Sequence, residues 1–327
     1  MVEQKLTKNE RREQAREQAR IAREAEKKRE KRNRLFLQGG VLVGVLAILG
    51  IVALVLTQSA KPAGPGPENM ASGGVTFTKD LEVVRGPALA EGAAREAIQV
   101  DRTKKPLDVT VFVDYMCPAC GAFEAAYGEV LEPFVGSGDI NLTINPINFL
   151  DSQSAGTKYS TRAANLMSCV VDEQPEGDHA FRLHNLLLSE AVQPDEGTSG
   201  LTDEQLLDQA EAAGVTVNNE LKQCVKDRRF ADFINGNTKQ ALEVGVLGLA
   251  DGARLVRASQ VALEGVSDDD LQPADEPQRL VSTPTVIVNG KQWYSTRDGN
   301  LQTYLLKVMS DLEGTNGDSG DGEASDG

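Results

Sequence analysis

Two cysteines separated by two residues are the part of this sequence best suited to chemistry. Cys117 and Cys120 enclose Pro118 and Ala119. Thiol–disulfide exchange needs one stabilised thiolate and a second thiol close enough to resolve the mixed disulfide. A cysteine pair at the beginning of a helix meets both needs, because the unpaired N–H groups of the first turn stabilise an anion. We therefore predict that Cys117 is the reactive thiol and that Cys120, one turn deeper, is the resolving thiol.

The residues around this motif predict a strand before it and a helix that begins at it. Residues 108–115 form a β-branched and aromatic run, which is typical of a buried strand. Pro118 occupies an early helical position, where proline is tolerated. Apolar side chains then recur at helical spacing, at Phe123, Tyr127, Val130, Leu131 and Phe134. The cysteine pair is thus predicted to lie where a buried strand meets a helix.

Other segments predict the rest of an α/β domain. Strands are predicted over 75–84 and 140–148, and a hairpin over 284–295 around the turn dipeptide Asn289-Gly290. Residues 158–248 contain only helical patterns, and 301–312 predict a closing helix. The resulting order is β, β, α, β, a helical block, β, β, α. An all-helical insertion therefore interrupts one predicted sheet.

A proline begins the apolar strand of the predicted hairpin. The sequence there is Ser282-Thr283-Pro284-Thr285. A cis peptide bond before a proline is usually a deliberate local feature. A cis bond between Thr283 and Pro284 would therefore be a deliberate feature of this segment.

Together these features resemble the DsbA-like branch of the thioredoxin superfamily over residues 75–312. The resemblance rests on Asp114-Tyr115-Met116-Cys117-Pro118-Ala119-Cys120, the helical insertion, and Thr283-Pro284-Thr285 with Val288-Asn289-Gly290. It implies a thioredoxin fold with an inserted all-helical domain at about 155–248. It also implies an active-site disulfide between Cys117 and Cys120, faced by a Thr283-Pro284 cis-proline loop that offers main-chain hydrogen bonds to substrate. It implies no cofactor.

The chain departs from that family at three places. The best-known DsbA enzymes have histidine between their cysteines where this chain has Ala119, so we expect a milder oxidant. Many thioredoxins have a buried acid six residues before the first cysteine, where Val111 stands here. Asp114 lies nearer the motif, and we expect it to be exposed. Residues 246–282 form an extra loop or helix, either an acidic loop or one that shapes a substrate groove.

A long apolar run precedes the predicted domain. Residues 35–56 contain no charged residue and are long enough to cross a bilayer, so we predict a transmembrane signal anchor over 35–57. Basic residues cluster directly before the run, which predicts a cytoplasmic segment over 1–34 and an extracytoplasmic remainder in the cell membrane. The charged 1–34 segment predicts a solvated helix that orients the anchor, an explanation we favour over a nucleic-acid role.

Charge and composition limit the ligands and structures that can be expected for the remaining segments. The chain has a net charge of −15, and because residues 1–34 carry +6, the remainder carries −21. An acidic remainder argues against nucleic acid as a ligand, since phosphates are bound by Lys and Arg. Residues 58–74 are rich in Pro, Gly and Ser and predict a linker, whereas 313–327 predict an acidic disordered tail.

The two remaining cysteines lie on predicted helices of the insertion. In an oxidising compartment a structural disulfide between Cys169 and Cys224 is favoured over free thiols or a redox relay, because neither has a neighbouring cysteine. A zinc site using all four thiols is a weaker alternative, since the second pair is not another closely spaced motif. We predict no metal, and His179 and His184 are interpreted as ordinary helix residues.

These observations predict a membrane-anchored, extracytoplasmic thiol:disulfide oxidoreductase that introduces disulfides into exported proteins with reduced cysteines. By family analogy, a quinone-linked membrane reoxidant of the VKOR or DsbB type restores the disulfide. An isomerase or reductase of the same fold is the alternative, and the isomerase is disfavoured because we expect no dimerisation module before the redox domain. We also expect a monomer. A non-catalytic tethered chaperone or scaffold is a second alternative, which the intact cysteine motif disfavours.

Overall fold

Strand β2 (Leu107–Val113) divides its side chains between the two faces of a sheet. The computed structural model of the protein describes residues 65–257 and 266–317. The odd-numbered residues of β2 are buried in the main core, whereas Asp108, Thr110 and Phe112 face the opposite side. This alternation follows from the two-residue period of a strand. β2 therefore separates the layer of helices that contains the cysteine pair from the layer behind the sheet.

Five strands in the described residues form one mixed sheet. Its order is β1-β3-β2-β4-β5, with β1 at Val75–Phe77, β3 at Ile140–Pro146, β4 at Thr285–Val288 and β5 at Lys291–Trp293. β2 and β3 are parallel, and the other pairs are antiparallel. Phe112 pairs with Thr285 at the start of β4. The residues before β4 are consequently brought to the end of β2, where the cysteine motif follows.

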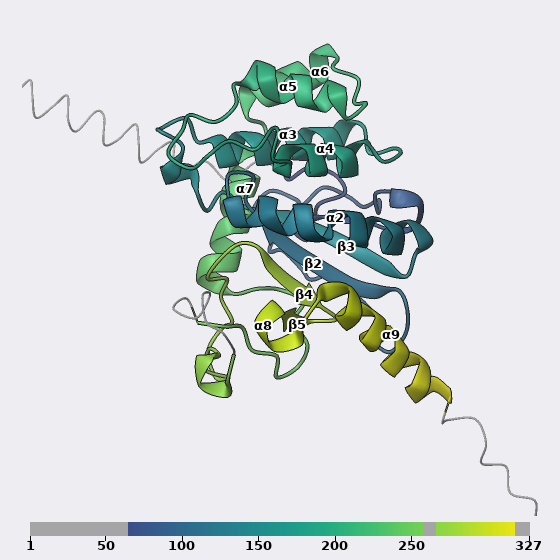
Figure 1. Ribbon diagram of the computed structural model, residues 1–327. Coiled ribbons are helices and arrows are strands. Elements are labelled where there is room, and N and C mark those ends of the chain that lie inside the picture. Colours follow the sequence, from purple (N-terminus) through teal and green to yellow (C-terminus); the bar gives the residue numbers. More distant parts are fainter. Residues whose placement is uncertain (1–64, 258–265, 318–327) are drawn as a thin grey trace, which may run out of the picture. The chain divides into compact units, whose positions relative to one another are not determined.

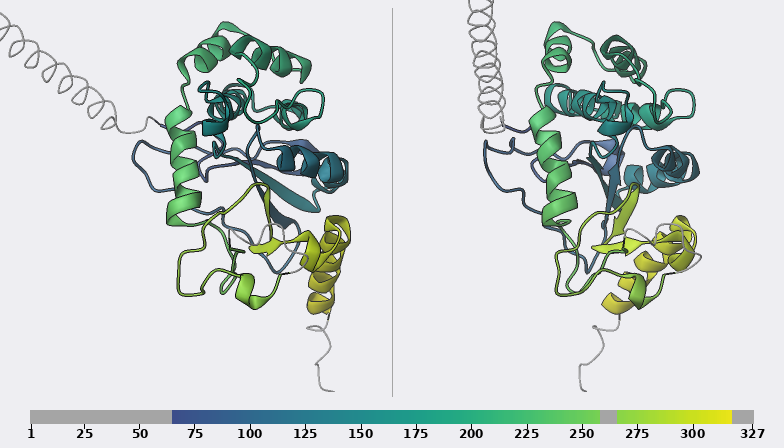
Figure 2. Two further views of the ribbon diagram at one scale, coloured as in Figure 1. Left: turned by 60° about the vertical axis from the view of Figure 1, so that its left-hand side comes forward. Right: turned by 90° about the vertical axis from the view of Figure 1, so that its left-hand side faces the viewer.

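Helices cover both faces of the sheet. Helix α2 (Pro118–Ser137) and helix α9 (Leu301–Gly317) lie on one face, and α7 (Ala231–Lys239) lies on the other (Figure 2). The short helix α8 (Ser295–Asp298) connects β5 to α9.

The helical insertion follows β3 and continues the layer of α2. It comprises α3 at Tyr159–Glu173, α4 at His179–Leu188, α5 at Asp203–Ala212, α6 at Asn219–Asp227 and α7, which ends in a π-helical turn at Gln240–Val244. In Figure 1, α3 and α4 lie above α2, and α5 and α6 lie above them. Every residue of α3 from Tyr159 to Val171 is buried. The insertion shares one hydrophobic core with the sheet.

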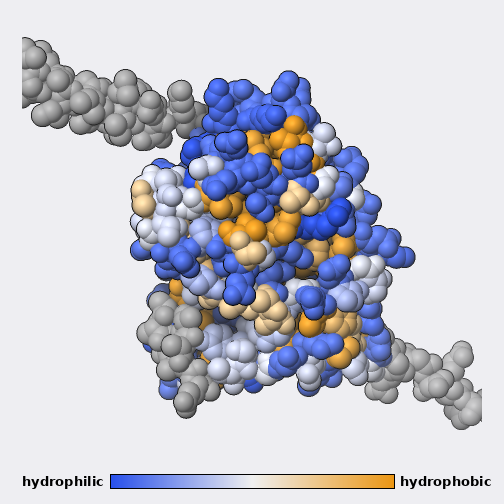
Figure 3. All heavy atoms as spheres, turned by 45° about the horizontal axis from the view of Figure 1, so that its top comes forward, coloured by the Kyte–Doolittle hydropathy of each residue, from blue (hydrophilic) through white to orange (hydrophobic). Residues whose placement is uncertain are grey.

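The prediction of an α/β fold with thioredoxin-type element order and an all-helical insertion is confirmed. The first strand is shorter than predicted. It ends at Phe77, because Asp80 and Leu81 adopt positive φ values in a short 3-10 helix, and the chain returns to an isolated bridge at Val83. The surface over the insertion is mostly hydrophilic with smaller apolar areas (Figure 3), as expected for an acidic domain.

Residues 65–74 do not behave as the predicted linker. Met70 is fully buried, and the Asn69 side chain donates a hydrogen bond to the carbonyl of Val171 on α3. The main chain of Gly66 also bonds to Leu89. The linker prediction failed here because composition did not reveal the single apolar anchor, Met70. The folded domain therefore includes residues 65–74.

The C-terminal boundary also differs from the prediction. Helix α9 continues to Gly317, five residues into the predicted tail of 313–327. Residues 318–327 lie outside the described residues, as do the predicted cytoplasmic segment, the signal anchor at 35–57 and residues 58–64 of the predicted linker. Between residue 65 and residue 317, the described helices include none with the length and apolar character needed to cross a bilayer.

The described parts of segment 246–282 pack beside the edge of the sheet. The main chain of Val246 bonds to Gln278, and Leu280 bonds to Ala241 at the end of the insertion. The N–H of Val256 donates to the side chain of Gln292 on β5. Residues 258–265 lie outside the described residues. The segment therefore covers the end of the sheet at β5 instead of forming a freely projecting loop.

Cys169 and Cys224 form a disulfide that joins α3 to α6. Both cysteines are fully buried, and 55 residues separate them in the sequence. Nearby, the Asn165 side chain accepts a hydrogen bond from the N–H of Phe230. The bond therefore crosses the insertion at a place where helices are already packed together.

We predict that replacing both Cys169 and Cys224 with serine lowers the free energy of unfolding by about 4 kcal/mol, because the unfolded chain regains the freedom of a long loop. Urea denaturation of the purified residues 65–317 measures this loss. The reactivity of Cys117 in the folded variant should remain unchanged. Equal unfolding midpoints for the variant and the parent would show that the disulfide is not stabilising.

Candidate active site

Cys117 caps the N-terminus of helix α2. Its backbone is extended (φ −77°, ψ 115°), and Pro118 occupies the first helical position. Proline suits this position because its missing N–H would have no helical partner. The N–H of Cys120 donates to the carbonyl of Cys117 at 2.9 Å. Both thiols are unbonded, so the structure represents the reduced form.

The two thiols differ sharply in environment. Cys117 retains 8% exposure, whereas Cys120 is fully buried. A hydrogen bond from the Cys120 thiol, followed by contributions from Thr283 and the N–H groups of Cys120 and Ala119, lowers the pKa of Cys117 to about 6 despite partial burial. Burial, followed by the hydrogen bond to Cys117 and its charge, raises the pKa of Cys120 well above its usual value. One sulfur is thus a stabilised thiolate with slight exposure, and the other is a fully buried thiol.

Thr283 and Pro284 lie beside the sulfur pair. The peptide bond between them is cis, and the Cys117 thiol donates to the Thr283 carbonyl at 3.4 Å. The Thr283 hydroxyl is buried and has no hydrogen-bond partner in the described part of the chain. When Cys117 ionises, this hydroxyl can donate to the thiolate, which accounts for its lowering of the Cys117 pKa. The structure therefore brings Cys117, Cys120 and Thr283-Pro284 together.

Asp114 is not exposed, contrary to the prediction from sequence. It is fully buried at the end of β2. Its carboxylate accepts hydrogen bonds from the N–H of Met116 at 2.9 Å, the N–H of Leu150 at 2.8 Å and the hydroxyl of Ser160 at 2.6 Å. Burial raises its pKa to about 6 even though these bonds favour the charged form. The prediction failed because the partners at 150 and 160 come from another strand end and from the insertion.

The two histidines occupy different environments. His179 is partly exposed near Asp178 and Arg182, as expected for an ordinary helix residue. His184 is only 2% exposed and lies against Tyr115, two residues before Cys117. Neither belongs to a group of three potential metal ligands among residues 65–257 and 266–317. The Cys169–Cys224 disulfide also occupies two of the four thiols that a zinc site would require.

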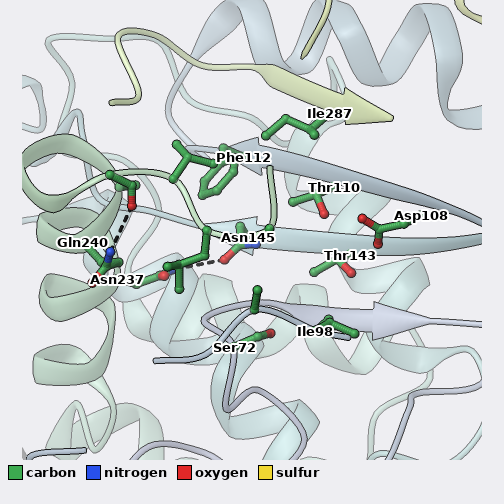
Figure 4. Close-up of a pocket in the computed structure, with 16 residues that line it drawn as sticks. Ser72, Ile98, Asp108, Thr110, Phe112, Thr143, Asn145, Asn237, Gln240 and Ile287 are labelled. Carbon is green, nitrogen blue, oxygen red and sulfur yellow. Dashed lines mark hydrogen bonds between the residues drawn. The ribbon is translucent and has the colours of Figure 1, made fainter. Parts of the chain in front are cut away.

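A separate pocket lies on the other face of the sheet (Figure 4). Its lining includes Asp108 and Thr110 of β2, Thr143 of β3 and Gln240 at the end of α7. Burial raises the pKa of Asp108 to about 6, with Arg102 opposing this rise. Neither cysteine of the redox motif lines the pocket. It is therefore distinct from the sulfur site.

We predict that the alkylation rate of Cys117 in the reduced protein rises with a midpoint near pH 6, instead of the ordinary 9.0, because the thiolate is stabilised. Cys120→Ala removes the strongest stabilising hydrogen bond and should move this midpoint upward. Iodoacetamide labelling followed by peptide mass spectrometry measures both. Cys117→Ser is the control that should abolish labelling at pH 7. An unshifted midpoint in the parent protein would contradict this description of the site.

We predict that Asp114 makes the folded protein less stable as the pH rises from about 4 to 6. Its folded pKa of about 6 exceeds the ordinary 3.8, so the folded state binds more protons than the unfolded state within this window. The free energy of unfolding should fall by up to about 3 kcal/mol and then level off. Asp114→Asn should remove this part of the pH dependence in urea denaturation. A variant with the same slope as the parent would exclude Asp114 as its source.

Comparison with known proteins shows what these features are similar to. Residues 100–248 match the sequence profile of a family described as Thioredoxin. The chain is also 28% identical over 120 residues to the serine/threonine-protein kinase PknE of Mycobacterium tuberculosis, covering 36% of this chain and 21% of PknE. The chain thus spans about a fifth of the length of the curated relatives it matches.

Similar solved structures include the reduced form of the disulfide bond oxidoreductase DsbG from Mycobacterium tuberculosis, with 23% identity and a TM-score of 0.48 over 74% of this chain and 88% of that chain. Oxidised BdbD from Bacillus subtilis is 18% identical, with a TM-score of 0.46 over 77% of this chain and 100% of that chain. The profile match covers the strand, cysteine motif and helical insertion described above. Residues 100–248 of this chain are therefore similar to the family described as Thioredoxin, and the described elements have the strand and helix order of an α/β thioredoxin-type fold.

Proposed function

We propose that this chain is an extracytoplasmic thiol:disulfide oxidoreductase that introduces disulfide bonds into exported proteins through Cys117 and Cys120. The observation that carries the proposal is the contrast between the two sulfurs. Cys117 retains 8% exposure and has a pKa of about 6, whereas Cys120 beside it is fully buried with a pKa well above its usual value. A stabilised Cys117 thiolate favours the reduced form of the protein, and a protein whose reduced form is stabilised oxidises others.

In the proposed reaction, a substrate thiolate attacks Cys117 Sγ of the oxidised protein. The Cys117–Cys120 bond breaks, a mixed disulfide forms, and the Cys120 sulfur leaves and takes up a proton. A second substrate thiol loses its proton and attacks the substrate sulfur of the mixed disulfide, releasing Cys117 as a thiolate. The substrate loses two electrons and gains a disulfide, and the protein gains the two electrons as the Cys117 thiolate and the Cys120 thiol.

The groups around Cys117 support its role as leaving group in the second step. A thiolate of low pKa leaves faster, and at pH 7 a pKa of about 6 corresponds to a roughly tenfold excess of thiolate over thiol. No histidine between the two cysteines contributes to this stabilisation, because that position is held by Ala119, which is apolar and exposed. The Cys120 thiol and Thr283 provide stabilisation in its place. We propose that the protein is therefore an oxidant, although a milder one than enzymes with histidine at this position.

The proposed location follows from the sequence before the domain. The apolar run over 35–56, preceded by basic residues, supports a single-pass signal anchor that holds the catalytic domain outside the cell membrane. Exported proteins with reduced cysteines are the proposed substrates, because disulfides persist in that compartment. We also propose that the chain acts as a monomer and is reoxidised by a quinone-linked membrane protein of the VKOR or DsbB type. Nucleic acid is not a proposed partner.

We predict that Cys120→Ser, expressed as the full chain in its native host, accumulates mixed disulfides between Cys117 and exported proteins. Without the resolving thiol these intermediates persist, and their abundance should exceed that of the parent by at least about tenfold. Acid trapping, non-reducing electrophoresis and mass spectrometry identify them. Cys117→Ser/Cys120→Ser is the matched control and should form none.

A second measurement separates oxidase from isomerase or reductase activity. The purified oxidised domain should convert a reduced two-cysteine peptide into its disulfide. For each peptide oxidised, one protein molecule should gain free thiols at Cys117 and Cys120. Deletion of the gene should leave exported proteins with more free thiols. Failure to oxidise the peptide, combined with reduction of disulfide-bonded substrates, would replace the oxidase proposal with the reductase alternative. Loss of Cys117 reactivity in both directions would favour a non-catalytic scaffold.

A further inference from the structure

One side chain of the helical insertion reaches the peptide turn that presents Cys117. Gln193 lies in the segment after α4, and its Nε2 donates to the carbonyl of Cys117 at 2.9 Å and to the carbonyl of Tyr115 at 3.3 Å. These carbonyls stand on the two sides of Met116. One side-chain amide therefore bridges the carbonyls of residues 115 and 117, which lie in the connection between the end of β2 and the start of α2.

The first turn of α2 leaves space for this amide. A Cβ at Gly121 would lie 2.1 Å from Oε1 of Gln193 and 3.1 Å from the carbonyl of Leu188. Glycine costs about 1 kcal/mol in a helix interior relative to alanine, so a glycine directly after Cys120 is unfavourable for the helix itself. Its presence is explained by the Gln193 side chain, which occupies the volume that a methyl group would take.

The Tyr115 end of the turn is held from a second direction. The Tyr115 hydroxyl and His184 Nδ1 are 3.3 Å apart, and His184 Nε2 lies 3.4 Å from Glu124 Oε2 on α2. Tyr115 is fully buried and His184 is 2% exposed. Because the ring of Tyr115 is fixed by α4, the hydrogen bond from Gln193 constrains the main chain between Tyr115 and Cys117 and does not simply follow its movement.

We propose that Gln193 is a positioning residue of the redox centre, whose amide holds the 115–117 turn so that the Cys117 sulfur faces its stabilising donors. This inference rests on the proposed function and assigns part of it to the helical insertion. The donors to Cys117 are the Cys120 thiol, Thr283 and the N–H groups of Ala119 and Cys120, so a small rotation of the turn weakens several hydrogen bonds at once.

Gln193 acts on the main chain of Cys117, because its Nε2 donates to the Cys117 carbonyl. The titratable groups that interact with the Cys117 sulfur include Cys120 on α2 and Asp114 at the end of β2. Gln193 is uncharged and contacts neither in the hydrogen bonds described, so replacing it leaves their ionisable groups in place.

The test compares Gln193→Ala and Gln193→Met with the parent in purified reduced residues 65–317. Met retains the length and volume of the side chain but removes its amide. Both variants should raise the midpoint of Cys117 alkylation by roughly half to one pH unit, the shift expected from losing one hydrogen bond near a charged group. In glutathione buffers at pH 7, the equilibrium should move roughly two- to fivefold toward the Cys117–Cys120 disulfide. Gln302→Ala, at an exposed position on α9, is the matched control and should change neither value.

Gly121→Ala provides an independent arm, because it displaces the Gln193 amide without altering Gln193. Alone it should shift the alkylation midpoint in the same direction as Gln193→Ala. Combined with Gln193→Ala it should add little, since the displaced group is already absent. Circular dichroism and thermal unfolding establish that the variants are folded.

The outcomes distinguish this inference from the proposed function. A parent midpoint near pH 6 that is unchanged in both Gln193 variants would overturn the positioning role and leave the oxidase proposal standing. A shift in Gln193→Ala but not in Gln193→Met would also overturn it, because packing alone would then explain the effect. A parent midpoint near 9 would contradict the proposed function itself.

Discussion

The hydrogen bond between the two sulfurs is the interaction on which the rest of the site depends. It requires one fully buried thiol that remains protonated and one slightly exposed sulfur that ionises. This asymmetry needs a helix that begins at Cys117, so that residue 120 turns inward. It also needs a sheet that places Thr283 against the outer sulfur, which the pairing of β2 with β4 achieves. The thioredoxin-type core thus serves to hold two chemically identical groups in unequal surroundings.

The parts of this arrangement that depend on local pattern could be predicted from sequence. The β-branched run before Cys117, the proline after it and the apolar spacing beyond it indicate a strand, a turn and a helix within thirty residues. Thr283-Pro284 could be associated with the motif only through resemblance to a family, since 162 residues lie between Cys120 and Thr283. The all-helical character of the insertion was also evident from its periodicity, although the order in which its helices pack was not.

The parts that depend on contacts between distant segments could not be predicted. Asp114 is polar and adjacent to a loop, so exposure was the reasonable expectation, yet its three donors come from residues 116, 150 and 160. Gln193 carries no signal in a single sequence, because an amide in a loop is ordinary until its two carbonyl partners are known. Met70 was missed for the same reason, since one apolar residue in a Gly/Pro-rich segment has no periodicity. Whether an isolated polar or apolar side chain finds partners in the folded protein depends on tertiary structure, which the local pattern of the sequence does not reveal.

The complete burial of Cys169 and Cys224 has a consequence for the order of events during maturation. Once α3 and α6 have packed, neither sulfur can be reached by a dissolved oxidant or by another protein. The bond between them must therefore be made while the insertion is still open, before the native core has closed. Under the proposed function, a newly synthesised copy therefore receives its buried disulfide from an oxidant that acts on the incompletely folded chain, in a step separate from the exchange at Cys117 and Cys120.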